Sequence, residues 1–157
     1  MSRFFVNVEA VIWRQGRFLV IERGPEESFG AGWLAFPGGK ADWNGEEANT
    51  VEHTACRELA EEVGLIVGGP WHFVESKSFG IGSDPVLDIV MLARYETGDP
   101  TIVSPGEVAS VAWLTPAEIE ADPRTQPWTL VTLQKLVRAI ADLDWEHSSD
   151  EELSMLP

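Results

Sequence analysis

The sequence predicts an α/β fold in which a single domain contains a mixed β-sheet with helices packed on both of its faces. The chain has 157 residues, and neither a linker nor an internal repeat divides it. This length suits one domain with a substantial core. Segments with the alternation of strands are interleaved with segments of helical period, in an order that suits a mixed sheet. The hydrophobic content of 44% excludes an intrinsically disordered chain.

The first third of the chain is expected to contain three strands. They are expected over residues 4–13, 17–22 and 33–36. The first two are rich in β-branched and apolar residues, and the Gln15-Gly16 pair between them predicts a hairpin turn. The loop over residues 24–32 is long and contains glycine, which favours a position beside a substrate over a connection inside the core.

A helix is expected in the middle of the chain, over residues 50–63. Its buried stripe consists of apolar and small side chains at helical spacing, namely Val51, Thr54, Ala55, Leu59 and Val63. Gly64 follows the helix, and glycine adopts the left-handed backbone of a helix end at little cost. At the beginning of the helix, either Asn49 or Thr50 is expected to act as the cap.

The second half of the chain is expected to contain three further strands and two helices. The strands are expected over residues 71–79, 86–94 and 108–114, with a turn at GIGSDP between the first two. A short helix is expected over residues 116–120, with Thr115 as its N-cap. A last helix is expected over residues 127–143, with Leu130, Leu133, Val137 and Ile140 on one side. The domain is then expected to span residues 1–143, and the acidic tail 144–157 is expected to be frayed.

Composition limits the partners and the compartment. The net charge is −15 and there is no basic stripe, so we do not expect a nucleic-acid partner. A single cysteine, Cys56, excludes an intrachain disulfide framework and favours a reducing compartment. In its apolar setting this thiol is more typical of a small buried residue than of a nucleophile. No apolar run reaches transmembrane length and no signal peptide is evident, so we expect a cytoplasmic protein without a membrane partner.

Three glutamates on the central helix predict a metal site. Glu58, Glu61 and Glu62 are at the spacing that places side chains near one another on a helix surface. Three clustered carboxylates repel one another, whereas Mg²⁺ prefers oxygen ligands and a bound phosphate. Gly38 and Gly39 precede the helix in an expected loop, where bare backbone can approach a ligand closely. The alternative is an ordinary solvated face of a helix.

The same stretch resembles the signature of the Nudix hydrolases, G-x5-E-x7-R-E-U-x-E-E-x-G-U, where U is aliphatic. RELAEEVGL at residues 57–65 matches the second half at every specified position, and FPGGK at residues 36–40 is similar to the usual approach to it. The first half departs, because Asn49 stands in place of the first glutamate. A four-residue insertion in ADWNGEEAN accounts for the spacing. Glu46 or Glu47 is then expected to fold back and replace the missing carboxylate.

The resemblance implies an α/β/α sandwich and an activity. Nudix hydrolases cut a diphosphate bond in a nucleoside diphosphate linked to another group. By resemblance, Glu58, Glu61 and Glu62 should be catalytic and should bind Mg²⁺, or Mn²⁺ in its place, with the Gly39 carbonyl as a further ligand. Arg57 should orient one of these glutamates through a charge-assisted hydrogen bond. Its alternative is an ordinary surface ion pair with Glu61.

The general base and the substrate are less constrained. Glu107 is our candidate base outside the signature, with Asp84 and Asp88 as weaker rivals. We expect the substrate to contact Arg23, Gly38, Gly39 and Lys40. Five aromatic residues are candidates for stacking on a base, although each is also typical of a core: Trp33, Phe36, Phe79, Trp113 and Trp128.

Elimination leaves a nucleoside triphosphate or a damaged nucleotide as the expected substrate. Residue marks of three subfamilies are absent or incomplete, because Ile81 stands where ADP-ribose hydrolases have a proline. The only tyrosine, Tyr95, lies outside the region that marks dinucleoside-polyphosphate hydrolases, and only part of the coenzyme A signature is present. The alternative is a nucleotide-sensing module of the same fold without turnover. A homodimer is compatible with the sequence, which localises no interface.

Overall fold

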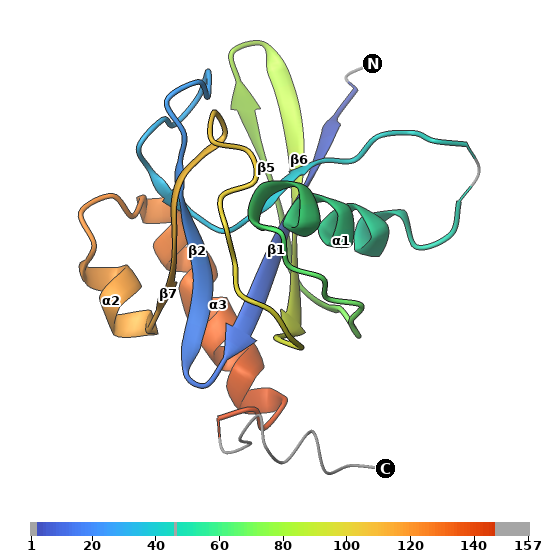
Figure 1. The fold of residues 1–157 in the computed structure, drawn as a ribbon. Helices are drawn as coiled ribbons and strands as arrows, with labels where there is room; N and C mark the ends of the chain where they lie inside the picture. The colour runs from blue at the N-terminus through green and yellow to red at the C-terminus, as the bar shows by residue number, and fades with distance from the viewer. Residues whose placement is uncertain (1–2, 46, 147–157) are drawn as a thin grey trace.

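A computed structural model describes residues 3–45 and 47–146 of the chain as one mixed sheet with helices on both faces (Figure 1). Seven strands and three helices follow one another along the chain. They are β1 (Phe5–Arg14), β2 (Arg17–Arg23), β3 (Leu34–Ala35), β4 (Gly38–Lys40), α1 (Thr50–Val63), β5 (His72–Ile81), β6 (Asp84–Arg94), β7 (Val108–Leu114), α2 (Pro116–Ala121) and α3 (Pro127–Asp142). The predicted fold class is confirmed.

Strand β1 lies at the centre of the sheet. The strand order is β3-β2-β1-β6-β5, with β7 paired to β2 and β4 paired to β1. β1 runs parallel to β6 and antiparallel to β2 and β4, which makes the sheet mixed. One edge of β1 is shared, because β2 pairs near Trp13 and Arg14 whereas β4 pairs with residues 7–9. This sharing places the glycine strand β4 beside the middle of β1.

Each face of the sheet has its own apolar core. Successive residues of a strand point to opposite faces, so Val8, Ala10 and Ile12 of β1 pack with α1, whereas Val11 and Trp13 pack with α3. In α1 the packed side chains include Ala55, Leu59 and Val63, and in α3 they are Leu133, Leu136 and Ile140. Figure 1 shows α1 in front of the sheet and α3 behind it. The expected α/β/α sandwich is confirmed.

The central helix has the predicted bounds and the predicted end. Gly64 has a φ of 69° and its N–H donates to the Ala60 carbonyl, as expected of a left-handed helix end. The Thr115 side chain accepts from the Glu118 N–H and caps α2, which confirms that N-cap. Asn49 occupies the N-cap position of α1 in left-handed backbone, with a φ of 59°, and its side chain makes no capping hydrogen bond.

Two expectations about local structure are wrong. Gly38–Lys40 is a strand paired with β1, and not simply a turn. In α3 the buried position is Leu136, whereas Val137 is exposed, because Leu133, Leu136 and Ile140 follow the helical spacing toward the sheet.

The packed chain continues past the expected domain boundary at residue 143. Trp145 is buried, with its ring 5.4 Å from that of His72 and beneath Arg94. The rest of the expected tail, residues 147–157, lies outside the described residues. None of the described helices combines the length and the apolar character needed to cross a membrane.

Candidate active site

The three predicted glutamates of α1 have different environments. Glu62 is 6% exposed and the Glu58 side chain 14%, whereas the Glu61 side chain is 60% exposed. Glu58 and Glu62 are four residues apart and therefore share a face of the helix. The structure thus brings two carboxylates together at the sheet and leaves the third in solvent.

Strand β4 lies directly against this carboxylate pair. A Cβ atom on Gly39 would stand 2.3 Å from the Glu58 Cδ, so a side chain there would displace the Glu58 carboxylate. The Gly38 N–H faces the Glu62 carboxyl group and lowers its pKa. A Cβ on Gly38 would also come within 2.2 Å of the Val8 carbonyl oxygen of β1. Gly38 is therefore required by close packing against β1, and Gly39 leaves the Glu58 carboxylate in its place.

Arg57 joins β4 to the pair. Its Nη2 donates to the Lys40 carbonyl over 2.7 Å and to Glu58 Oε1 over 3.0 Å. Glu61 and Asp42 each lie 3.9 Å from another nitrogen of the guanidinium group. The expected contact with a signature glutamate is therefore present, through one nitrogen. It is combined with a backbone contact that the sequence did not predict.

Glu62 has the strongest electrostatic perturbation in this region. Burial raises its pKa to about 8, and the nearby charges of Glu58 and Glu107 add to the effect, while the Gly38 N–H and Arg23 oppose it. Burial also raises the pKa of Glu58, opposed by Arg57. Within the described part of the chain, Glu62 Oε2 is buried without a hydrogen-bond partner. A carboxylate in this state lacks a cation or donor.

Glu107 and Arg23 approach the pair from two other segments. The β6–β7 loop is attached to the end of α1, because the Val103 N–H donates to the Glu62 carbonyl. Further along this loop, the Glu107 carbonyl accepts from the Gly24 N–H over 2.7 Å. Arg23 donates to the Phe29 carbonyl and to Glu27, which fixes its guanidinium group near the carboxylates. The exposed side chain of Glu107 is therefore held beside the site.

The donor set fits a divalent cation that also binds a substrate phosphate. No three of the described histidine, cysteine, aspartate and glutamate side chains are already gathered into a metal cage. Mg²⁺ needs no such cage, because it commonly uses one or two carboxylates, waters and substrate oxygens. Glu58 and Glu62 provide hard oxygen donors of that kind, and the Gly39 carbonyl stays a predicted further ligand. The partnerless Glu62 oxygen is the local observation that agrees with a missing ligand.

Of the two residues expected to replace the missing glutamate, Glu47 has other partners in the structure. Glu47 contacts His53, and its backbone carbonyl accepts from the Thr50 hydroxyl. Neither interaction involves Arg57. The other candidate, Glu46, lies outside the described residues. Asp42 is the acidic residue of this loop near Arg57, and its side chain is mostly exposed.

The remaining candidates lie in several different places. Lys40 is exposed, and its ammonium group lies over the Phe5 ring, on the other side of β4 from Glu58. Asp84 is exposed at the β5–β6 turn, and Asp88 is buried on the α3 side of the sheet. Among the aromatic candidates, Phe36 belongs to the core and Trp33 packs edge-on against Trp128. Trp113 packs against Tyr95.

One polar cluster was not predicted from the sequence. On the α3 side of the sheet, Glu9, Glu75 and Asp88 surround Lys77. These residues come from three strands, so no local spacing connects them. The only signal available was alternation in β1, where a glutamate stands among apolar residues.

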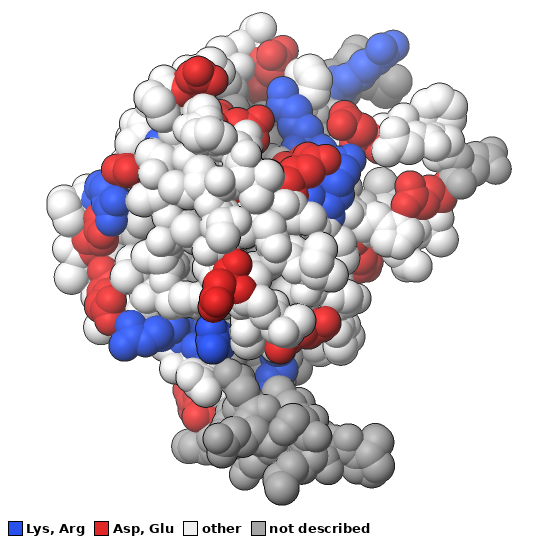
Figure 2. Space-filling model, viewed as in Figure 1, with Lys and Arg blue, Asp and Glu red and all other residues white. Residues whose placement is uncertain are grey.

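Charge is mixed around α1. Figure 2 shows basic and acidic side chains side by side at this helix, and the described residues of this face form no continuous basic surface. A mixed sheet between two helices, with an acidic pair packed against a glycine strand, is the arrangement that the resemblance to Nudix hydrolases led us to expect.

Comparisons with known proteins agree with this expectation. A family model described as the NUDIX domain matches residues 3–136. The MutT NUDIX hydrolase from Burkholderia pseudomallei has 26% sequence identity and a TM-score of 0.72, over 85% of this chain and 98% of that chain. The MutT protein from Methanosarcina mazei Go1 has 21% identity and a TM-score of 0.74, over 88% and 96% of the two chains. No protein with a curated description matches the chain.

A further similar structure is the NUDIX domain of Shewanella oneidensis NrtR, solved with ADP ribose. It has 17% identity and a TM-score of 0.73, over 89% of this chain and 90% of that chain. The chain therefore belongs to the NUDIX family, and by this membership it is a Nudix pyrophosphohydrolase.

Proposed function

We propose that this chain hydrolyses a diphosphate bond in a nucleoside diphosphate linked to another group, with Mg²⁺ as its cofactor and Mn²⁺ as an alternative. The proposed substrate is a nucleoside triphosphate or a modified nucleotide. The observation that carries the proposal is the buried, partnerless Oε2 of Glu62, four residues from Glu58 and against β4. Arg57 pairs with Glu58 but not with Glu62, and a buried carboxylate without an ion-pair partner suits an external cation with its phosphate.

Different residues of the candidate active site would bind the cation, orient its ligands and contact the phosphate. Glu58, Glu62 and the Gly39 carbonyl would hold the cation, which supplies charge neutralisation and makes a coordinated water more acidic. Arg57 fixes the Glu58 carboxylate and the Lys40 carbonyl relative to each other. Arg23 is placed to contact a phosphate, since its charge already acts on Glu62. Glu61, in solvent, has at most an accessory role.

The hydrolytic step needs a proton acceptor. Water forms a bond to phosphorus, the bridging P–O bond breaks, and the water proton must leave to a base. We assign this role to Glu107, because its exposed side chain lies close enough to raise the pKa of both Glu58 and Glu62. The assignment agrees with catalysis of phosphoryl transfer by positioning and charge stabilisation.

A substrate screen tests the proposal. The full chain is incubated with nucleoside triphosphates, oxidised nucleotides, nucleotide sugars and dinucleotides, with Mg²⁺ or Mn²⁺, and phosphate and pyrophosphate release are scored separately. We expect pyrophosphate or a nucleoside monophosphate from at least one class, and complete loss of turnover with EDTA. Turnover that persists in EDTA, or that is absent across the panel with both metals, would overturn it.

The second candidate is a nucleotide-sensing module without turnover. It is favoured by Asn49 in place of the first glutamate of the signature and by the similarity to the NrtR domain solved with ADP ribose. Calorimetry discriminates between the two functions. Micromolar binding of ADP ribose or another nucleotide, with no product after prolonged incubation, would favour the sensor.

We also propose a cytoplasmic location, supported by the single cysteine, which suits a reducing compartment.

A further inference from the structure

The sheet face opposite the acidic pair contains a row of polar side chains that the proposed reaction does not use. In register across neighbouring strands, Lys77 pairs with Asp88, and Asp88 pairs with Asn7. One row further, Glu75 and Glu9 both pair with Val90. Residues paired directly across strands point to the same face. We call these five polar residues, Asn7, Glu9, Glu75, Lys77 and Asp88, the charged sheet face.

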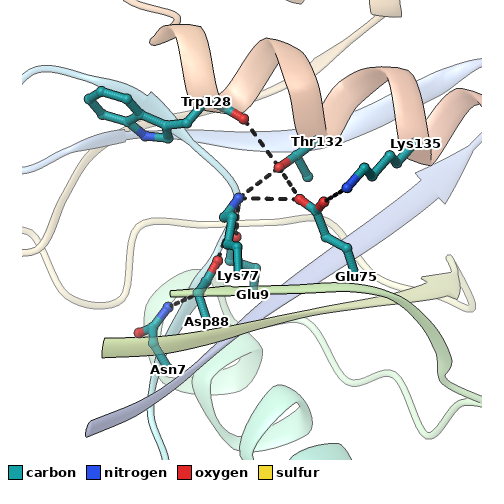
Figure 3. Close-up of polar contacts among 8 residues, drawn as sticks. All are labelled: Asn7, Glu9, Glu75, Lys77, Asp88, Trp128, Thr132 and Lys135. Atoms are coloured by element: carbon teal, nitrogen blue, oxygen red, sulfur yellow. Dashed lines mark hydrogen bonds and ion pairs between the residues drawn. The ribbon is translucent and has the colours of Figure 1, made fainter. Parts of the chain in front are cut away.

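Lys77 lies at the centre of this face, where oxygen atoms of four side chains surround its ammonium group (Figure 3). Its Nζ lies 2.7 Å from Thr132 Oγ1 of α3 and 3.4 to 3.6 Å from oxygens of Glu75, Glu9 and Asp88. Glu75 is further bound by Lys135, at 2.6 Å. Lys77 therefore has no free donor for a phosphate, whereas three carboxylates contribute more acceptor oxygens than the lysines use.

Glu9 is the acidic residue most accessible to a ligand. Its side chain is 19% exposed, compared with 3% for Asp88 and 6% for Glu75. Asn7 donates to Asp88 Oδ1 over 2.7 Å, which leaves its own amide oxygen directed away from Asp88 (Figure 3). Lys40, which pairs with Asn7, brings an exposed ammonium group to the rim of this face, whereas the groups that remain available beside Glu9 are acceptors.

Aromatic side chains border the charged sheet face and are themselves exposed. Phe5, Phe79 and Trp128 are 46%, 41% and 48% exposed. Phe5 and Phe79 pair with Val86 and so form the next row of the same face. Trp128 begins α3 beside Thr132, with its ring 5.3 Å from that of Trp33. Exposed rings beside polar groups provide stacking surfaces for a planar heterocycle.

This face is continuous with the candidate active site through β4. Glu9 pairs with Gly38, and Asn7 pairs with Lys40. On the opposite side of the same strand, Gly39 packs against Glu58. β4 pairs only with β1 among the described strands, and its outer edge faces Arg57 and Glu62 of the candidate active site, so the width of this one strand separates that site from the charged sheet face.

We propose that the charged sheet face binds the base of the substrate and that Glu9 is a specificity-determining residue that favours bases with an amino group. This inference rests on the proposed function and names the substrate class of that site. Adenine, cytosine and guanine present amino N–H donors to the carboxylate oxygens. Uracil and thymine present carbonyl oxygens on both sides of one N–H, and these oxygens would oppose the acidic residues. Phosphates and acidic sugars are disfavoured beside Glu9 for the same reason.

Burial and the adjacent Asp88 raise the pKa of Glu9, with Lys77 opposing. A proton held between these two carboxyl groups still leaves the outward oxygen of Glu9 as an acceptor. The proposed selectivity therefore does not require Glu9 to be fully ionised.

The test compares Glu9→Gln with wild type on ATP, GTP, CTP and UTP, and on tripolyphosphate, which has no base. We expect wild-type kcat/KM to be at least tenfold higher for one or more amino-bearing nucleotides than for UTP. Glu9→Gln should reduce that ratio at least fivefold, because the amide also donates to a carbonyl, while tripolyphosphate turnover stays within twofold. Glu120→Gln, an exposed residue of α2, is the matched control and should change neither value.

Trp128→Ala provides a second test of the same face if Glu9→Gln does not fold. It should raise KM for nucleotides about tenfold and leave tripolyphosphate turnover within twofold. An unchanged nucleotide ratio in Glu9→Gln, or an equal loss on tripolyphosphate, would overturn the proposal, because either result indicates a merely structural role.

Calorimetry with adenosine, guanosine, cytidine and uridine separates this inference from hydrolysis. Preferential binding of amino-bearing nucleosides by a protein that hydrolyses none of the substrates would support the proposed base-binding site and contradict the proposed hydrolytic activity. Hydrolysis without any preference among nucleosides or nucleotides would support the proposed hydrolytic activity and contradict the proposed base-binding site.

Discussion

Each face of the sheet contains a group of neighbouring acidic side chains, and the two groups differ in how far the chain itself supplies the positive charges that balance them. On the α1 face, Glu58 is half-buried and bound by Arg57, whereas Glu62 is buried and one of its oxygens has no partner. On the α3 face, three carboxylates surround Lys77, and Lys135 binds one of them. The first group is incomplete within the described chain, whereas the second contains its own cations. The difference indicates which group is built to receive an external cation.

The pKa directions follow the same division for Glu62, Glu75 and Lys77, whereas Glu9 of the second group is an exception, because burial and Asp88 raise its pKa despite Lys77. Burial and like charges raise the pKa of Glu62 to about 8. Burial tends to raise the pKa of Glu75. The hydrogen bonds from Lys135 and Thr132 and the charge of Lys77 outweigh burial, so the pKa is lowered. Burial lowers the pKa of Lys77, but the surrounding carboxylates outweigh it and the pKa is raised. A paired charge is retained in the fold, whereas an unpaired one tends to be neutralised.

The largest expected effect is on activity, from Glu62→Gln. The substitution keeps the size of the side chain and removes the charge that would hold the cation, so kcat/KM should fall about a thousandfold, or roughly 4 kcal/mol. Steady-state assays with saturating Mg²⁺ measure this, with Glu120→Gln as the control. Activity within tenfold of wild type would mean that the α1 pair is not the incomplete group.

The next largest effect should be on stability, from removing the ammonium group of Lys77 on the α3 face. Lys77→Met leaves three carboxylates around an apolar chain and should lower the free energy of unfolding by about 3–5 kcal/mol. Lys135→Met is the matched control, because Lys135 is 54% exposed and Lys77 26%, and its loss should cost about 1 kcal/mol or less. Urea unfolding of both variants gives the comparison. Equal losses would show that the second group does not depend on its central lysine.

The pH dependence of stability distinguishes the groups at a smaller scale. A carboxyl group whose pKa is raised in the folded state stabilises the fold below its unfolded pKa of about 4.5, and this stability is lost as pH rises toward 8. Glutamine does not titrate, so in EDTA Glu62→Gln should melt ~4 °C or more above wild type at pH 8.5. The difference should shrink toward pH 5. A Tm difference independent of pH would contradict the buried-charge explanation.

The smallest effect should come from the third glutamate of the helix. Glu61 is mostly exposed, so Glu61→Gln should change kcat/KM less than about threefold and the free energy of unfolding by less than about 0.5 kcal/mol. Both values come from the same assays as for Glu62→Gln. A loss as large as that of Glu62→Gln would show that Glu61 turns inward when substrate and cation bind.

The sequence predicted the parts of the molecule that depend on local pattern. Helix α1 has the expected bounds because apolar periodicity and Gly64 both specify them. Strand β4 was missed because three residues with two glycines carry no alternating pattern. Helical spacing identified Glu58, Glu61 and Glu62 as neighbours, but their different burial depends on how the helix sits on the sheet.

The charged sheet face was not predictable for a different reason. Its residues come from β1, β5 and β6, and they meet only through the register of those strands. The partner of Arg57 was missed in the same way, because the Lys40 carbonyl reaches it only after β4 pairs with β1. Tertiary register, which no single segment encodes, therefore determines both polar arrangements.

Trp145 has a practical consequence for shortening this polypeptide. A truncation after residue 143, where sequence composition suggests a boundary, would delete an indole that closes one end of the core beneath α3. Such losses of a large buried ring cost about 3–5 kcal/mol. Expression variants and carboxyl-terminal fusions should therefore keep the native chain through at least Trp145 before any foreign segment begins.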